Sequence, residues 1–499
     1  MNGVKVANIK QYFCFLFLLL SILLSFCVPA QENNLCLPKN LNDNPQHVLP
    51  CYVKQSTTSP ANWKLMKTEP ENSLTVYTYE LTSQFWPDKT LSKSGKVWQH
   101  TLILHVPKQI KNNQAFLYIN SGINSKNDFK MSPKGLSDLA KKYGSVVVDL
   151  HDVPNQYLTF DDGVPRKEDG IVAYTWNKYM ENPSTNAYWP VQLPMVKSVV
   201  EAMNAVQAIA TIQKYSKVPE QFVLSGASKR GWATWLTSLV DKRVHAIIPI
   251  VIDIFNIENN IAHIHNSLGK WPFAFHDYAE QGRIKNLHSK EFRQLAKIID
   301  PISYRKYPEY KSRLAIPKLI INASSDDFFV PDSLLQYVDQ LSGNNTIKIL
   351  PNQNHNVNFT NVDNPISEYF GLLLEKKTLP QLTWNENKNS QYIEVTTDFI
   401  PSGEVTHWQA KNKNVRDFRL RHFSVDKQGK IKANPTGIQY QASTIKGNCN
   451  KQRCTFRLLK AEKGKAYQAQ FLEFPYRNGA HAFTTTSPVF ITPDVYQNQ

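Results

Sequence analysis

Hydrophobic and polar positions alternate with two different periods through the middle of the chain, residues 111–380. Short apolar runs such as 115–119 and 318–322 have the length of buried strands, and stretches such as 194–215 carry apolar residues at helical spacing. Strands that alternate with helices form a mostly parallel sheet with helices on both faces, so this pattern predicts an α/β domain. Further strands are expected at 145–150, 222–224, 245–251 and 347–350, and further helices at 133–143, 232–240, 332–341 and 365–377.

The regions on either side of this domain follow a different pattern. Residues 31–110 contain expected strands at 74–79 and 98–106 and lead into the sheet. After residue 380 the helical spacing stops, and short alternating strands predict a β-sandwich-like domain over 381–499. These strands are expected at 393–397, 405–410, 418–423, 466–474 and 489–492.

Residues 254–312 interrupt the alternation between two expected strands of the sheet. They combine aromatic residues with short amphipathic segments. Such an insertion predicts a helical cap that covers the active site of the α/β domain. Trp271 and Phe275 belong to an aromatic cluster in this segment. That cluster forms either the core of a small helical layer or the lining of a pocket that selects substrates.

The first thirty residues have the pattern of a secretory signal peptide. Lys5 and Lys10 precede an apolar run over 12–28, and small residues up to Ala30 mark a cleavage position. An uncleaved membrane anchor is the alternative, although no later run reaches the roughly 20 apolar residues that cross a bilayer. We therefore expect a secreted or periplasmic protein.

Four cysteines remain after the signal peptide: Cys36, Cys51, Cys449 and Cys454. An even number of cysteines in an exported protein indicates disulfides, and the local pairs Cys36–Cys51 and Cys449–Cys454 are the simplest of three pairings. A zinc site is less favoured because neither pair has the spacing of a zinc knuckle.

The stretch 222–232 joins an expected strand to an expected helix through a turn that carries Ser228. Gly226 precedes this serine and Gly231 follows it, in the spacing Gly-x-Ser-x-x-Gly. This is a variant of the turn on which α/β-hydrolases present their nucleophile. On this stretch alone, a purely structural turn is the alternative.

A serine nucleophile needs a histidine base and a carboxylate that orients the histidine, and in this fold the acid precedes the histidine along the chain. Asp326 follows the expected strand at 318–322, and His355 follows the expected strand at 347–350. Asp327 in the same loop is the alternative acid. Taken singly, Asp326 could cap a turn and His355 could be a surface histidine. Together, however, Ser228, Asp326 and His355 each follow an expected strand and occur in the order nucleophile, acid, base, which predicts a catalytic triad.

The oxyanion hole of such an enzyme needs two backbone N–H groups. We expect one from Lys229, which follows the nucleophile, and one from Gly122, in the loop after the strand at 115–119. His263 and His265 lack the further ligands of a metal site, and the sequence has no phosphate-binding glycine loop. We therefore predict no metal and no cofactor.

The chain is basic, with a formal net charge of +16, and its hydrophobic content of 41% is enough for a sizeable core. No nucleic-acid-binding motif accompanies the charge, so we interpret it as a dispersed, solvated surface and expect no nucleic-acid partner. A basic exported protein is suited to peripheral contact with anionic surfaces. The sequence leaves the oligomeric state open.

Five segments of the chain carry a resemblance to a known family. They are Asp152-Val153-Pro154-Asn155-Gln156, Glu168-Asp169-Gly170-Ile171-Val172-Ala173-Tyr174-Thr175-Trp176, Gly226-Ala227-Ser228-Lys229-Arg230-Gly231-Trp232, Asp326-Asp327-Phe328-Phe329 with Pro331-Asp332, and Pro351-Asn352 to His355. These segments resemble the PhoPQ-activated pathogenicity-related proteins of the α/β-hydrolase superfamily, and the resemblance spans about residues 40 to 495. It implies that Ser228 is the nucleophile, Asp326 the acid and His355 the base. The chain departs from the family pattern at Ser324-Ser325 and at Asn356, neither of which removes a catalytic group.

We therefore expect an exported serine hydrolase, an esterase or a peptidase, that cleaves a small-molecule ester or peptide through an acyl-enzyme intermediate. The family name links it to a virulence regulon. A non-catalytic binding or signalling protein on the same scaffold is the alternative. Gly-x-Ser-x-x-Gly turns also occur in esterases that act on uronate esters, and Lys229 or Arg230 could contact the carboxylate of such a sugar. A surface or interdomain ion pair is the alternative role for both cations.

Overall fold

The computed structural model describes residues 35–496 except 56–61, 126–129, 282–286, 388, 427–429, 463 and 465. The predicted signal peptide, residues 1–30, lies outside the described residues. Within the part of the chain that is described, no helix combines the length and the hydropathy needed to cross a membrane.

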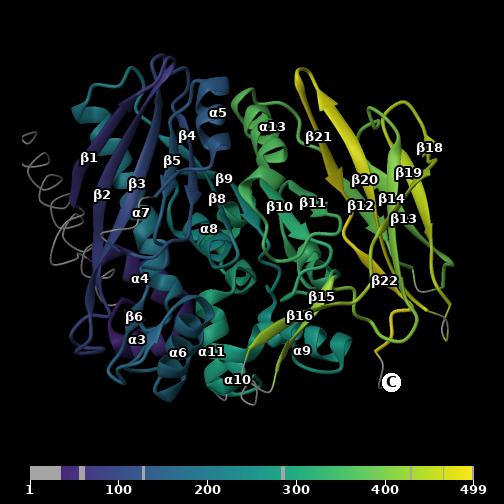
Figure 1. The fold of residues 1–499 in the computed structure, drawn as a ribbon, viewed down its shortest axis with the longest axis horizontal. Helices are drawn as coiled ribbons and strands as arrows, with labels where there is room; N and C mark the ends of the chain where they lie inside the picture. The colour runs from purple at the N-terminus through teal and green to yellow at the C-terminus, as the bar shows by residue number, and fades with distance from the viewer. Residues whose placement is uncertain are drawn as a thin grey trace, which may run out of the picture.

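A nine-stranded sheet is the framework of the larger part of the molecule (Figure 1). Its order is β1-β2-β3-β5-β4-β8-β9-β10-β11. The strands from β5 to β11 in this order run parallel, and β1, β2 and β3 add an antiparallel edge. The strands are β1 (Asn62–Pro70), β2 (Leu74–Trp86), β3 (Lys96–Pro107), β4 (Gln114–Ile119), β5 (Val147–Leu150), β8 (Gln221–Ala227), β9 (Val244–Ile250), β10 (Lys318–Ala323) and β11 (Asn345–Leu350).

Helices cover both faces of the parallel part of this sheet. Every residue of β4 and of β10 is buried, as expected for strands that are covered on both sides. Neighbouring residues of a strand point to opposite faces. Accordingly, Phe116 packs in one cluster with Leu136 of α5 (Lys134–Tyr143), whereas Leu117 packs in another with Leu236 of α8 (Lys229–Val240). The chain therefore has the α/β-hydrolase fold that the alternating pattern predicted.

The remaining α-helices lie before, between and after the strands of the sheet. The segment between β9 and β10, where the cap was expected, is helical and contains α9 to α12. The helices are α3 (Pro38–Asp43), α4 (Val48–Lys54), α6 (Glu168–Glu181), α7 (Gln192–Ile212), α9 (Ile257–Leu268), α10 (His276–Glu280), α11 (Lys290–Ile299), α12 (Pro308–Leu314) and α13 (Asp363–Leu374). Short 3-10 helices are η1 (Pro45–His47), η2 (Phe273–Phe275), η4 (Pro301–Lys306), η5 (Ser333–Gln336), η6 (Val338–Gln340) and η7 (Phe359–Asn361).

The C-terminal region is built from antiparallel strands, as predicted (Figure 1). Two of its sheets have the orders β12-β13-β19-β18 and β17-β14-β20-β21, with β22 paired to β20. The hairpin β15–β16 forms a separate two-stranded sheet, as does β6 (Leu158–Thr159) with β7 (Pro165–Arg166) earlier in the chain. The strands are β12 (Leu382–Asn385), β13 (Tyr392–Thr397), β14 (Val405–Asn412), β15 (Arg421–Val425), β16 (Ile431–Pro435), β17 (Gln441–Ile445), β18 (Asn448–Cys449), β19 (Cys454–Leu459), β20 (Tyr467–Asn478), β21 (His481–Thr486) and β22 (Phe490–Thr492).

Three expectations about local structure were wrong. The helix expected at 332–341 is replaced by η5 and η6, because Tyr337 between them leaves helical geometry (φ −146°) and packs at 5.4 Å against Phe255. Residues 38–54 were expected in a strand-rich region but are helical. The strand expected at 418–423 begins only at Arg421.

Both expected disulfides are present in the structure. Cys36 is joined to Cys51 across the helical segment at the start of the described chain, with Cα atoms 5.6 Å apart. Cys449 is joined to Cys454 across the turn between β18 and β19, with Cα atoms 4.0 Å apart. Such pairs form in oxidising compartments.

Candidate active site

Ser228 occupies a sharp turn between β8 and α8. Its backbone has φ 54° and ψ −124°, a combination that a residue with a side chain rarely adopts and that the surroundings must enforce. The two flanking glycines allow this turn. A Cβ atom on Gly226 would lie 2.8 Å from Arg230 Cβ, and one on Gly231 would lie 2.8 Å from Ile252. The second glycine of the variant spacing is therefore required by contact of α8 with the chain after β9.

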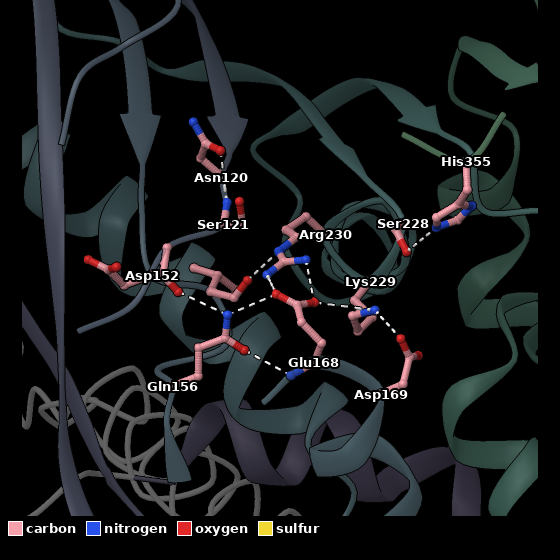
Figure 2. A network of polar contacts seen from close by, with 12 residues as sticks. Asn120, Ser121, Asp152, Gln156, Glu168, Asp169, Ser228, Lys229, Arg230 and His355 are labelled. Atoms are coloured by element: carbon pink, nitrogen blue, oxygen red, sulfur yellow. Dashed lines mark hydrogen bonds and ion pairs between the residues drawn. The ribbon is translucent and has the colours of Figure 1, made fainter. Parts of the chain in front are cut away.

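His355 lies in the loop that follows β11. Its Nε2 atom is 2.9 Å from Ser228 Oγ, and its Nδ1 atom is 2.8 Å from Asp326 Oδ2 (Figure 2 shows the first of these contacts). The imidazole is largely buried, with 12% of the side chain exposed, and its ring centroid lies 4.4 Å from that of Phe328. The three residues predicted as a triad thus form one continuous chain of hydrogen bonds.

Asp326 and Asp327 leave β10 side by side but have different surroundings. Asp326 Oδ1 accepts hydrogen bonds from the N–H groups of Phe328 and Phe329, which fix its orientation. Asp327 Oδ2 instead lies 3.8 Å from the guanidinium of Arg421. Burial, followed by the charge of Asp326, raises the pKa of Asp327 to about 6.

The two backbone groups predicted for the oxyanion hole differ in their relation to the cavity beside the serine. The N–H of Lys229 is at the first position of α8, directly after Ser228, where helix N–H groups have no partner within the helix. In the loop after β4, Asn120 and Ser121 line a cavity together with Ser228 and His355, but Gly122 is not part of that lining. The carbonyl of Gly122 accepts a hydrogen bond from Gln156 Nε2.

A network of charged side chains, in which the cations are buried and the acids partly buried, lies beside the turn (Figure 2). Arg230 donates to both carboxylate oxygens of Glu168, at 2.8 and 2.5 Å, and Gln156 Nε2 donates to the same carboxylate. Lys229 Nζ lies 2.8 Å from Asp169 Oδ2 and 3.3 Å from Glu168 Oε2. Burial alone would raise the pKa of Glu168, but the charges of Arg230 and Lys229 hold it well below its usual range.

The same network decides between the two roles that the sequence left open for the cations. Both Lys229 and Arg230 are buried and engaged with acidic side chains of α6. Burial would lower the pKa of Lys229, but Asp169 and Glu168 raise it instead. The structure therefore favours ion pairs over a site for the carboxylate of a substrate, but these pairs are buried within the α/β domain, not on the surface or between domains as expected.

Two cavities meet at Ser228. The smaller has a volume of about 40 Å³ and is lined mainly by aromatic and aliphatic side chains, among them Trp271 and Phe275 of the cap segment. The larger has a volume of about 630 Å³ and also contains His355. The aromatic cluster of the cap thus contributes both to the apolar core and to the lining of the small cavity.

The C-terminal region contacts both loops that carry the acid and the base. In the acid loop, Asp332 is bound by the guanidinium of Arg416, and His263 Nε2 lies 3.0 Å from Asp332 Oδ1. In the histidine loop, Asn352 exchanges two hydrogen bonds with the backbone of Tyr440, at 2.7 and 2.9 Å. Both loops are therefore fixed from the far end of the chain.

Several residues of the site were not predicted individually. Glu168 and Asp169 stood in a family-like segment, but nothing in their spacing indicated that they pair with the cations beside Ser228. Arg416 gave no signal, since one arginine in a β-rich tail resembles any surface cation. His263, which the sequence raised as a weak metal ligand, is instead bonded to Asp332 and, at 2.9 Å, to the hydroxyl of Tyr496.

Comparison with known proteins gives relatives at two levels. The profile described as PhoPQ-activated pathogenicity-related protein matches residues 49–419. Autocrine proliferation repressor protein A of Dictyostelium discoideum is 36% identical over 375 residues, which are 72% of this chain and 73% of that protein.

Solved structures with a similar fold have much lower identity. An acetyl xylan esterase from Paenibacillus sp. R4 has a TM-score of 0.44 and 14% identity, over 68% of this chain and 94% of that one. Acetyl xylan esterase 1 from Thermoanaerobacterium sp. JW/SL YS485 has a TM-score of 0.45 and 12% identity, over 67% of this chain and 93% of that one.

Proposed function

The chain belongs to the PhoPQ-activated pathogenicity-related protein family, and from this premise we propose that it is an exported serine hydrolase that cleaves carboxylic esters. One observation carries the proposal. Ser228, on a strained turn, is hydrogen-bonded to His355, which is hydrogen-bonded to the buried carboxylate of Asp326. The two disulfides support export, because such bonds persist outside the reducing cytoplasm.

In the proposed mechanism, Ser228 Oγ attacks the ester carbonyl carbon while His355 Nε2 accepts the hydroxyl proton. Asp326 accepts the Nδ1–H of His355, which selects the tautomer with a free Nε2 lone pair and stabilises the imidazolium that forms. The tetrahedral intermediate collapses when His355 returns the proton to the departing alcohol oxygen. Water then attacks the acyl-enzyme by the same steps and releases the acid and free Ser228.

The negative oxygen of the tetrahedral intermediate needs fixed N–H donors. We assign one to the backbone of Lys229, at the start of α8. The second donor belongs to the loop after β4, because Asn120 and Ser121 of this loop line the cavity that contains Ser228 and His355. The N–H of Asn120 donates to the carbonyl of Leu150, and the N–H of Ser121 donates to Asn120 Oδ1, so we keep Gly122 as the proposed second donor. The charge network of Glu168, Lys229 and Arg230 supports this role by holding the first turn of α8 in place.

A fluorophosphonate probe, which reacts with activated serines, tests the proposal. We expect the mature protein to be labelled and to hydrolyse simple esters, and Ser228→Ala to lose both properties, with a loss of turnover of about 10⁶-fold. Ser225→Ala is the matched control. Ser225 lies on β8, the strand that leads into the turn with Ser228. It is buried and donates to the carbonyl of Ile248, so its replacement should leave labelling intact.

The same experiment addresses the alternative of a non-catalytic protein. The name of the Dictyostelium relative describes a repressor of proliferation, which is a signalling role. If folded wild-type protein is neither labelled nor active on esters, or if Ser228→Ala is labelled as strongly as wild type, the hydrolase proposal is wrong.

A further inference from the structure

Ser228 lies at the junction of two cavities that differ in size and chemistry. The small cavity of about 40 Å³ is lined on most sides by apolar groups of α6, α8, the cap and the acid loop. The large cavity of about 630 Å³ is lined by both polar and apolar groups. Its polar groups include Asn120, Ser121 and Asn358 of the loops after β4 and β11, and its apolar groups include Ile119, Val357 and Phe359. The two linings share Ser228, Lys229, Asp169 and Phe328.

The position of His355 assigns one part of an ester to each cavity. The base must give a proton to the departing alcohol oxygen, so the alcohol has to leave on the side where the imidazole lies. His355 lines the large cavity and is not among the residues that line the small one. The acyl group, which stays on Ser228, is then left with the small apolar cavity.

The volume of the small cavity limits the acyl group. About 40 Å³ corresponds to roughly three water-sized spaces, since one water needs about 10–15 Å³ by this measure. This is room for one to three carbon atoms beyond the carbonyl. An aminoacyl group with its flanking peptide is larger, and this favours an ester over a peptide as substrate.

The two charged groups at the rim do not change the apolar character of this cavity. Asp169 accepts hydrogen bonds from Lys229 Nζ at 2.8 Å and from the hydroxyl of Tyr278 at 3.0 Å. With both oxygens of Asp169 engaged, the surface offered to the acyl chain is formed mainly by rings and aliphatic groups, among them Trp176, Trp232, Ile252, Trp271 and Phe275.

We propose that the small cavity is an acyl pocket, and that the enzyme removes short acyl groups, from acetyl to butyryl, from polar alcohols that bind in the large cavity. This inference rests on the proposed serine esterase function. Its chemistry is the same two-step transfer, in which the acyl–oxygen bond of the ester breaks and a bond to Ser228 Oγ forms.

The test measures kcat/KM for the p-nitrophenyl esters of acetate, butyrate, hexanoate and octanoate. Because a methylene that does not fit an apolar pocket changes rates by about tenfold or more, we expect hexanoate and octanoate to be cleaved at least about tenfold less efficiently than acetate or butyrate. Equal values along the series, or a preference for octanoate, would overturn the acyl-pocket inference.

Variants connect the preference to the cavity. Phe275→Ala enlarges the pocket and should raise the ratio of hexanoate to acetate efficiency by about tenfold. Phe273→Ala is the matched control, since Phe273 lies on the same 3-10 helix η2 but faces Phe423 at 6.1 Å and does not line the pocket. Trp271→Leu, at a partly exposed position, is the second enlarging variant if Phe275→Ala does not fold. A folded enlarging variant with the wild-type ratio would contradict the inference.

The outcomes separate this inference from the function on which it rests. If wild-type protein is labelled by the fluorophosphonate and cleaves all four esters equally well, the esterase proposal is supported and the acyl-pocket inference is wrong. If it is neither labelled nor active on any ester, the esterase proposal is wrong and the acyl pocket is wrong with it.

Discussion

At the scale of single residues, two adjacent carboxylates in one loop have opposite surroundings. Asp326 is held by two backbone N–H groups and contacts His355, whereas Asp327 is close to Arg421 and has a raised pKa. The same residue type at successive positions therefore has different contacts, and the role proposed for Asp326 can be tested separately from the effect of Asp327.

We expect Asp326→Asn to lower kcat for ester hydrolysis by up to about 10⁴-fold, because an amide in that position favours the wrong tautomer of His355. Asp327→Asn should lower kcat by less than about tenfold, since the 326 carboxylate would still orient the base. Steady-state kinetics of the two variants, made in the same background, decide the assignment. The reverse order would move the acid to Asp327.

The raised pKa of Asp327 predicts a specific dependence of stability on pH. Its pKa is near 3.8 when unfolded and about 6 when folded, so the folded protein binds more protons between these values. The resulting cost is absent below about pH 4 and complete above about pH 6, where it amounts to roughly 2–3 kcal/mol. Asp327→Asn should remove this cost.

Urea unfolding of wild type and Asp327→Asn at pH 4 and pH 7 measures that cost. We expect the gain in the free energy of unfolding from the substitution to be larger at pH 7 than at pH 4. An equal difference at both pH values would mean that Asp327 is not destabilised when ionised. Titrating groups far from residue 327 cancel in this comparison, because they are common to both proteins. Asp326 and Arg421 interact with Asp327, so their contribution is part of the measured difference.

At the scale of helices and strands, the parts of the fold with strong local patterns were predictable from the sequence. The buried apolar runs became β4, β10 and β11, and the long apolar periodicity of 194–215 became α7 (Gln192–Ile212). These elements follow from burial alone, which leaves a periodic trace in the sequence. The antiparallel character of the C-terminal strands followed for the same reason.

The elements that were missed depend on contacts between distant residues. The segment after Asp332 does not form a regular helix where the buried Tyr337 packs against Phe255. Helix α6 was not expected, because it is buried on nearly all sides and has little amphipathic contrast. The spacing of apolar residues along the chain reveals neither a contact between distant residues nor the burial of a helix on nearly all sides.

In the candidate active site, too, the features set by local sequence pattern could be predicted, and the contacts between residues far apart in the sequence could not. Ser228, Asp326 and His355 could be proposed together from the sequence, because each follows an expected strand and their order is the one used in the α/β-hydrolase fold. The partners of Lys229 and Arg230 are about 60 residues away, and Arg416 is 84 residues from Asp332, so only the three-dimensional structure connects them.

At the scale of the whole molecule, a buried ion pair between Arg416 and Asp332 connects the C-terminal region to the α/β domain. Arg416 is 1% exposed, and burial would raise the pKa of Asp332, but Arg416 and His263 hold it well below its usual range. Breaking such a pair leaves an uncompensated buried charge.

We expect Arg416→Gln to lower the free energy of unfolding by about 3–5 kcal/mol. The control is Arg457→Gln, which removes a mostly exposed pair with Glu394 at 2.8 Å on strands of the same region and should cost less than about 1 kcal/mol. Denaturant unfolding measures both. Similar costs for the two variants would show that Asp332 does not depend on Arg416.

The two hydrogen bonds between Asn352 and Tyr440 have a consequence for the order in which the chain is synthesised and folds. The loop bearing His355 is synthesised before residue 440, and so is the loop bearing Asp326. A nascent or truncated chain therefore carries the serine before the parts that hold its acid and base loops in place. We expect the proposed hydrolytic activity to require folding of the C-terminal region at least as far as Tyr440. A chain that ends before Arg416 should therefore contain Ser228, Asp326 and His355 but show no ester hydrolysis, which an activity assay of the purified truncated protein measures.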